Sequence, residues 1–177
     1  MQSNIFGKLS FFQNQPVDSD NDIAVYGVIK NRRVVRYINQ KFIDKQSKNL
    51  YKYKILISKS SGSGIFGEAL SEPILLKPQE AYTYTFIGIG NFDTQVEAEN
   101  AIKYIKSKFA RAMLNVLKVT QDNTPEKWRC VPLQDFTPKS DIDWTQSISN
   151  IDQQLYHKYG LTNSEIEFLE ENVKPMG

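Results

Sequence analysis

The chain has 177 residues, of which 40% are apolar and 24% charged, and its formal net charge is +2. This length and composition predict one folded domain with a substantial core and exclude a disordered tail. No apolar run is long enough to span a membrane and the first residues lack a basic, apolar signal segment, so we expect a soluble, cytoplasmic protein that does not contact a membrane.

The charges are distributed unevenly along the chain. Residues 24–59 contain ten cations and the single acid Asp44, whereas residues 135–177 contain three lysines and eight acids. A strongly positive segment of this kind favours contact with a polyanion such as nucleic acid. A lysine-rich solvated surface would have the same composition, and this alternative stays open.

The first predicted element is a β-hairpin. Ile23 to Ile29 is rich in β-branched residues, Lys30-Asn31-Arg32 permits a tight reversal, and Val34 to Ile38 forms the returning strand. Because side chains alternate along a strand, Arg33 and Arg36 are expected on opposite faces. At least one of these arginines should therefore be free to meet solvent or phosphate.

A short helix is predicted for residues 42–50, and a strand for residues 51–57. Tyrosines alternate with lysines at the start of this strand, and an apolar run follows. The pattern indicates a strand that enters the core from a basic edge formed by Lys52 and Lys54.

The segment 59–67 contains three glycines in a G-x-G-x-x-G arrangement. A dinucleotide site would need a helix directly after them, and the segment up to Pro73 is too short for one. We therefore expect no nucleotide cofactor here. The loop is predicted to bring Lys59, Ser60, Ser61 and Ser63 close to a phosphate or a groove edge, with a plain surface loop as the alternative.

A core strand is predicted for residues 82–89, ending in a glycine turn. The sequence Phe86-Ile87-Gly88-Ile89-Gly90 matches the F-x-G-x-G of S-adenosylmethionine sites in DNA methyltransferases. That class also needs a catalytic Asp-Pro-Pro-Tyr-like tetrapeptide, and no Pro-Pro pair occurs in the chain. We therefore predict no cofactor in this chain.

One long helix is predicted from Gln95 to Val116. Thr94 and Glu97 have the spacing of a capping box, and apolar residues recur at helical intervals from Ala98 onwards. No acid lies between Glu99 and Asp122, so the cations of this helix are expected to form a second basic surface. Its members are Lys103, Lys106, Lys108 and Arg111.

The remaining chain is predicted to form a strand and two helices. The strand covers residues 128–133 and includes the single cysteine, Cys130, as a packed residue; a loop over residues 135–143 follows. Gly160 is expected to end the first helix, whose apolar face excludes Asp152, and Thr162 with Glu165 is a second capping box. The only histidine, His157, has no partner at catalytic or metal-ligand spacing and is predicted to lie at the surface.

The order of polar and aromatic residues from residue 82 to residue 176 resembles the C-terminal target-recognition region of Eco57I-like type II restriction-modification enzymes and adenine-specific DNA methyltransferases of bacteria. The residues that carry this resemblance include Phe92-Asp93-Thr94, Glu97-Ala98-Glu99-Asn100, Val131-Pro132-Leu133-Gln134-Asp135-Phe136, Asp141-Ile142-Asp143-Trp144, Lys158-Tyr159-Gly160-Leu161 and Pro175-Met176.

The resemblance implies that the chain recognises a DNA sequence for a catalyst that it does not contain. We expect an α/β (α+β) fold with a mixed, mostly antiparallel sheet, one long packed helix and a C-terminal two-helix segment. Residues 1–137 would form the recognition domain, and residues 138–177 would pack on it or on the parent enzyme. A separate domain or subunit of that parent would bind S-adenosylmethionine and methylate adenine N6.

The predicted DNA contacts are the basic and hydroxyl residues described above. Arginine can bind guanine through two hydrogen bonds, and lysine mainly neutralises phosphate. The set comprises Lys30, Arg32, Arg33, Arg36, Lys52, Lys54, Lys59, Ser60, Ser61, Ser63, Lys103, Lys106 and Arg111.

Two other functions remain possible at this point. A complete enzyme would bind its cofactor through residues 86–90, and a subunit-assembly module would bind a methyltransferase with little DNA affinity of its own. The chain has no Pro-Asp step followed by an acid-x-Lys triplet, so no catalytic residue or metal site of a nuclease is predicted.

Overall fold

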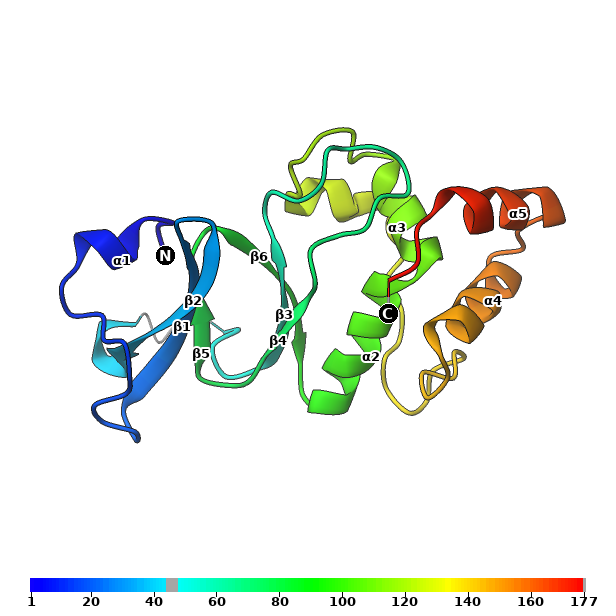
Figure 1. Ribbon diagram of the computed structural model, residues 1–177. Coiled ribbons are helices and arrows are strands. Elements are labelled where there is room, and N and C mark those ends of the chain that lie inside the picture. The colour runs from blue at the N-terminus through cyan, green and yellow to red at the C-terminus, as the bar shows by residue number, and fades with distance from the viewer. Residues whose placement is uncertain (44–47, 177) are drawn as a thin grey trace.

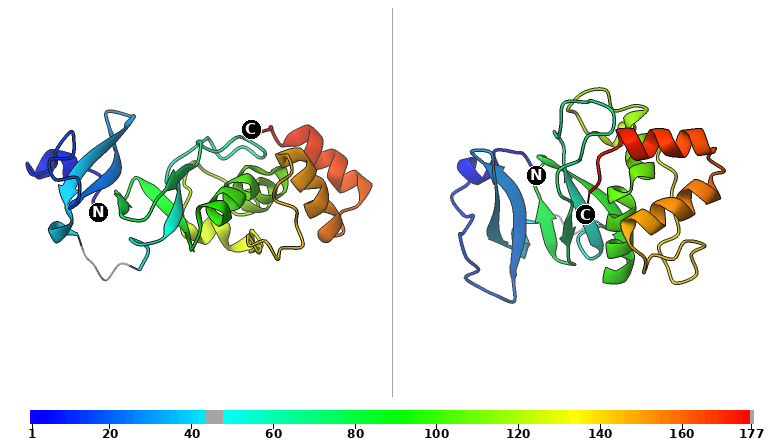
Figure 2. Two further views of the ribbon diagram at one scale, coloured as in Figure 1. Left: turned by 90° about the horizontal axis from the view of Figure 1, so that it is seen from below. Right: turned by 45° about the vertical axis from the view of Figure 1, so that its right-hand side comes forward.

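The computed structural model describes residues 1–43 and 48–176. Helices and strands occur together, which confirms the α+β class. The elements form successive layers along one long axis (Figures 1 and 2): an N-terminal sheet, a second sheet, a layer of α2 and α3, and a last layer of α4 and α5.

The N-terminal sheet confirms the predicted hairpin. Its strands are β1 (Asp22–Ile29), β2 (Arg32–Asn39) and β5 (Glu80–Tyr82), in the order β2-β1-β5. β1 and β2 pair antiparallel over their full length, and β1 pairs parallel with β5. The four-residue helix α1 (Ile5–Lys8) precedes the hairpin, and the short 3-10 helix η1 (Gln40–Phe42) follows it.

The helix predicted for residues 42–50 lies partly outside the described residues. Phe42 ends η1, and residues 48–50 form a turn.

The second sheet is antiparallel throughout. It contains β3 (Tyr53–Ser58), β4 (Ile74–Leu76) and β6 (Phe86–Phe92), in the order β4-β3-β6. The mostly antiparallel pairing was predicted correctly, but the strands are divided between two small sheets. Leu56, Leu76 and Phe86 form a buried cluster against which Tyr26 and Val28 of β1 pack, so the two sheets are joined by apolar contact.

The single strand predicted for residues 82–89 is wrong. Thr83 to Thr85 separate β5 from β6, because the chain turns there: the Phe86 amide donates to Thr83 O, 3.1 Å away. The predicted glycine turn is also wrong, since β6 continues through Gly88 and Gly90 to Phe92.

Two helices replace the one long helix that was predicted. α2 (Gln95–Lys106) begins with the predicted Thr94–Glu97 capping box, and α3 (Lys108–Asn115) follows after Ser107. Ser107 has an extended backbone, with a ψ of 148°, and its hydroxyl accepts a hydrogen bond from the Ala110 amide. A residue type that caps helices thus divides an otherwise continuous helical pattern.

The strand predicted for residues 128–133 is also wrong, because residues 125–130 form the 3-10 helix η2 (Pro125–Cys130). Proline at the start of η2 fixes a helical φ angle, and the indole nitrogen of Trp128 donates to the Asn123 side chain at 2.7 Å. Cys130 therefore ends a helical turn and is half-buried, not packed within a strand.

The last layer consists of α4 (Ile148–Lys158) and α5 (Asn163–Asn172). Gly160 follows α4 with a φ of 65°, and Thr162 with Glu165 caps α5 as predicted. Ile151 and Leu155 of α4 share a buried cluster with Phe109 of α3. Residues 138–176 therefore pack on the rest of this chain.

Candidate nucleic-acid interface

The tip of the β1–β2 hairpin displays a group of cations. Lys30 and Asn31 form the two-residue turn, with φ angles of 47° and 61°. Two positive φ angles in succession are typical of a type I′ turn, whose twist matches that of the paired strands. Lys30, Arg32 and Arg33 are all exposed at this end of the ribbon.

Arg33 and Arg36 of β2 have different environments. The guanidinium of Arg33 is exposed and donates to the carbonyl of Glu72 at 2.9 Å. Arg36 is half-buried and donates to the carbonyl of its neighbour Val35 at 3.0 Å. Arg33 is thus the one that reaches towards the second sheet.

A concave surface of about 470 Å³ lies between the hairpin tip and the second sheet. We call it the basic cleft. It brings together Arg33, Lys59 and Ser60, three predicted residues from distant parts of the sequence. Its other lining residues are Ser3, Val28, Asn31, Ser58, Tyr84, Thr85 and Asp122.

The backbone of Lys59 is held by hydrogen bonds to two other segments of the chain. Its amide donates to Thr85 O at 2.9 Å, and its carbonyl accepts from the Asn123 amide at 2.7 Å. The ammonium lies over the ring of Tyr84, 3.4 Å from the ring centroid, where it makes a cation–π contact. Ser60 forms an isolated antiparallel bridge with Asp122, whose carboxylate is exposed in the same cleft.

The glycine-rich loop does not offer its donors to a phosphate. The side chain of Glu68 occupies it and accepts from the Ser63 amide at 2.8 Å, the Ser63 hydroxyl at 3.0 Å and the Gly64 amide at 2.7 Å. The hydroxyl of Ser61 accepts from the Ser71 amide at 2.8 Å. Of the three serines predicted as DNA contacts, only Ser60 lines the basic cleft.

The interactions of Glu68 determine its protonation. Burial raises its pKa, but the hydrogen bonds from Ser63 and Gly64, together with Lys118 at 3.4 Å, outweigh burial and lower the pKa to about 2. The loop therefore holds an ionised carboxylate of its own chain at the place where a ligand anion was expected.

The predicted basic edge of β3 is not present. Lys54 is 1% exposed, and its ammonium donates to the carbonyls of Asn49 at 2.9 Å and Lys52 at 3.1 Å. Burial lowers the pKa of Lys54 to about 8. Lys52 forms an ion pair with Asp93. The alternation of residues in the sequence does not predict that the Lys54 side chain is buried. The carbonyls that accept its hydrogen bonds belong to turns and not to the strand.

The predicted second basic surface is wrong as well, because its cations contact their own chain. Arg111 is 1% exposed, and burial lowers its pKa. Lys103 donates to Trp144 O at 2.6 Å, whereas Lys106 and Lys108 pair with Glu72 at 2.6 Å and Glu170 at 2.5 Å. The acids that relieve repulsion along these helices come from distant segments.

Asp152 is a buried residue that the sequence pattern placed outside the apolar face of α4. It is 2% exposed, and its carboxylate accepts from the amides of Lys108 at 3.0 Å and Phe109 at 2.9 Å. These amides begin α3, so Asp152 caps this helix from α4.

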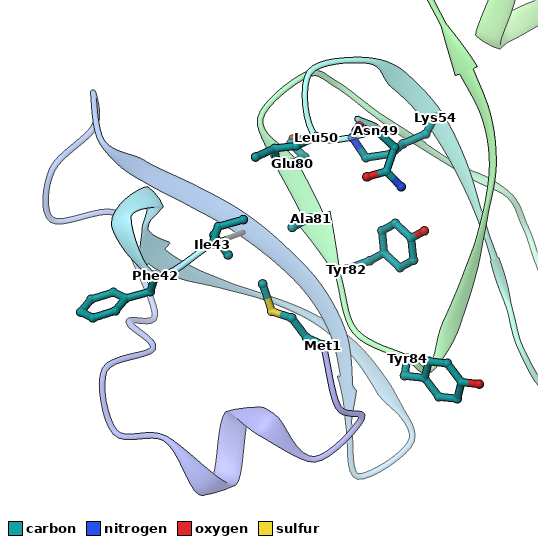
Figure 3. Close-up of a pocket in the computed structure, with 10 residues that line it drawn as sticks. All are labelled: Met1, Phe42, Ile43, Asn49, Leu50, Lys54, Glu80, Ala81, Tyr82 and Tyr84. Carbon is teal, nitrogen blue, oxygen red and sulfur yellow. Dashed lines mark hydrogen bonds between the residues drawn. The ribbon is translucent and has the colours of Figure 1, made fainter. Parts of the chain in front are cut away.

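A second cavity, of about 460 Å³, lies between the N-terminal sheet and β3 (Figure 3). The side chains of Tyr82, Asn49 and Lys54 lie on one side of this cavity, Met1 and Ile43 lie on the other, and Phe42 points away. Tyr84 lines this cavity as well as the basic cleft.

Comparison with family models, with curated proteins and with solved structures gives no match for this chain. The fold and the site define an α+β protein with a basic hairpin tip beside the basic cleft. Among residues 1–43 and 48–176, no three His, Cys, Asp or Glu side chains are grouped closely enough to hold a metal ion. Within the same residues, no helix has the length and apolarity needed to cross a bilayer.

Proposed function

We propose that this chain is a DNA target-recognition domain of a bacterial type II restriction-modification enzyme. It would position a separate adenine-N6 methyltransferase domain, and an endonuclease domain where the parent enzyme has one. The observation that carries this proposal is the grouping of exposed Lys30, Arg32 and Arg33 at the hairpin tip, beside Lys59 in the basic cleft.

The geometry of the hairpin suits a DNA groove. The major groove of B-DNA admits a two-stranded β-ribbon, and arginine can donate two hydrogen bonds to guanine there. Arg32 is the candidate for a base contact, because it lies at the exposed end of such a ribbon and on the opposite face from Arg33, whose guanidinium donates to Glu72 O. Lys30, Arg33 and Lys59 would neutralise phosphates beside the groove.

A salt titration tests the proposal. Fluorescence anisotropy with a labelled duplex should give a plot of log binding constant against log salt with a slope of about −3, since each of the three phosphate contacts releases about one counterion. Arg33→Ala should weaken binding and reduce the slope by about 1.

Lys139→Ala is the matched control, because Lys139 is exposed in the loop before α4 and does not line the basic cleft. The control should bind like the wild type. A wild-type slope near zero, or equal losses from Arg33→Ala and Lys139→Ala, would refute the proposal.

One observation favours the alternative, a module that assembles with the methyltransferase. Leu133 is 93% exposed beside an apolar cavity of about 440 Å³ whose walls include Phe92, Trp128 and Phe136. Exposed apolar surface of this kind often marks a protein interface. This function predicts weak, salt-independent DNA binding by the isolated chain and a stable complex with the methyltransferase, which Leu133→Asp would weaken.

A further inference from the structure

Tyr84 lies at the junction of three hollows on the surface. It lines the basic cleft, the cavity of Figure 3, and a wider hollow of about 570 Å³ formed with Met1, Gln2, Ser3, Asn4 and Lys8. Tyr84 is nevertheless 65% exposed. A large exposed aromatic residue thus borders all three cavities.

The backbone that carries Tyr84 is held firmly. The Tyr84 amide donates to Met1 O at 2.7 Å, and the Thr83 amide donates to Tyr26 O at 2.9 Å. Thr83 is fully buried, and its hydroxyl is 2.7 Å from that of Thr85. The ring therefore projects from a fixed segment, and holding it in place for a ligand costs little further conformational entropy.

The groups around the ring have the chemistry of a nucleotide site. Lys59 covers one face of the ring, and Arg33 lies in the same cleft, so two cations are available for a phosphate. Asn31 and Ser60 supply donors and acceptors for the edge of a base. The volume of about 470 Å³ is in the range of pockets that hold small organic ligands.

We propose that Tyr84 stacks against an unpaired nucleobase, and that Lys59 moves from the ring to the phosphate of the same nucleotide. This inference rests on the proposed DNA-binding function and names the nucleic-acid feature that the cleft takes. Base stacking on an aromatic side chain changes Kd by roughly 5- to 150-fold, whereas an exposed cation–π contact is equivalent to roughly 2- to 5-fold. Replacing the cation–π contact of Lys59 with base stacking on Tyr84 therefore favours binding of the base. Asp122 opposes a phosphate beside Ser60, with which it forms a β-bridge, so the phosphate is expected at the side chains of Arg33 and Lys59.

The test compares two DNA duplexes that differ only in one bulged 2-aminopurine nucleotide. The wild type should bind the bulged duplex at least about 5-fold more tightly than the paired one, and 2-aminopurine fluorescence should fall when the base stacks. Tyr84→Ala should remove this preference and the quenching, so that it binds the two duplexes with equal affinity. Tyr84→Phe keeps the ring and should behave like the wild type.

Tyr51→Ala is the matched control, because Tyr51 is also an exposed tyrosine, 48% exposed, but does not line the basic cleft. The inference would be overturned if the wild type bound the two duplexes with equal affinity, or if Tyr84→Ala kept the preference for the bulged duplex. Salt-dependent duplex binding would still support the proposed function in that case. Loss of salt-dependent binding to both duplexes would instead refute the proposed function, and the inference with it. Circular dichroism of each variant shows that the comparison is made between folded proteins.

Discussion

Replacing Glu68 by glutamine should destabilise the protein in a manner that depends on pH. The Glu68 carboxylate accepts hydrogen bonds from Ser63 and Gly64 in the turn that follows β3, and its side chain is 15% exposed. Glutamine has nearly the same shape but no charge. The amide oxygen can keep part of these bonds, whereas the amide nitrogen would face backbone donors.

The magnitude follows from the pKa of Glu68. Its folded value is about 2 and its ordinary value is 4.5, a difference that corresponds to about 3 kcal/mol in the free energy of unfolding. Because the folded pKa is depressed, this stabilisation is present above pH 4.5 and is lost as the pH falls towards 2. The free energy of unfolding of the wild type should exceed that of Glu68→Gln by about 3 kcal/mol at pH 7 and by about 1 kcal/mol at pH 2.5.

Urea denaturation of both proteins at the two pH values measures this difference. Glu72→Gln is the control, because the Glu72 side chain is 63% exposed and its ion pair with Lys106 should contribute less than about 1 kcal/mol. The reasoning fails if the difference between the wild type and Glu68→Gln is the same at both pH values.

Three further predictions concern stability measured by chemical denaturation. Asp152→Ala leaves the amides of Lys108 and Phe109 without their acceptor, and should cost about 2–4 kcal/mol; a loss below about 1 kcal/mol would contradict the capping role. Gly67→Ala places a Cβ 1.9 Å from the Asn172 carbonyl oxygen, so it should destabilise more than Gly160→Ala, where no atom lies within 4 Å; the reverse order would refute the close packing of the C-terminal segment. The pKa of Lys54 is lowered to about 8 from 10.5, so the free energy of unfolding of the wild type should rise as the pH is raised between these values, and that of Lys54→Met should not. Parallel pH profiles of the two proteins would count against burial of the charge.

The elements that were predicted correctly depend on contacts between near neighbours in the sequence. Each capping box joins residues three positions apart, as the bonds between Thr94 and Glu97 show. The hairpin turn depends on Lys30 and Asn31, whose conformation suits the twist of the two strands. Gly160 ends α4 because glycine adopts a positive φ without strain.

Two of the elements that were predicted wrongly depend on side-chain contacts that a sequence pattern does not show. Ser107 occurs in a helical pattern but also caps helices, and Asp152 of α4 accepts from the first amides of α3. Residues 128–133 alternate like a strand, but Pro125 and the Trp128–Asn123 hydrogen bond favour a 3-10 turn. Sequence periodicity cannot weigh such contacts, because the partner segments are placed only by the fold.

The sequence by itself determined where many of the helices and strands begin and end and which segment carries excess positive charge, since propensity, capping and composition are properties of short stretches of chain. Only the tertiary structure decided which cations are free to bind. Lys54 and Arg111 are buried, Lys106 pairs with an acid from a distant loop, and Arg33 and Lys59 meet in one cleft. Whether a charge is exposed depends on which segments pack beside it, and this packing is determined by the tertiary structure.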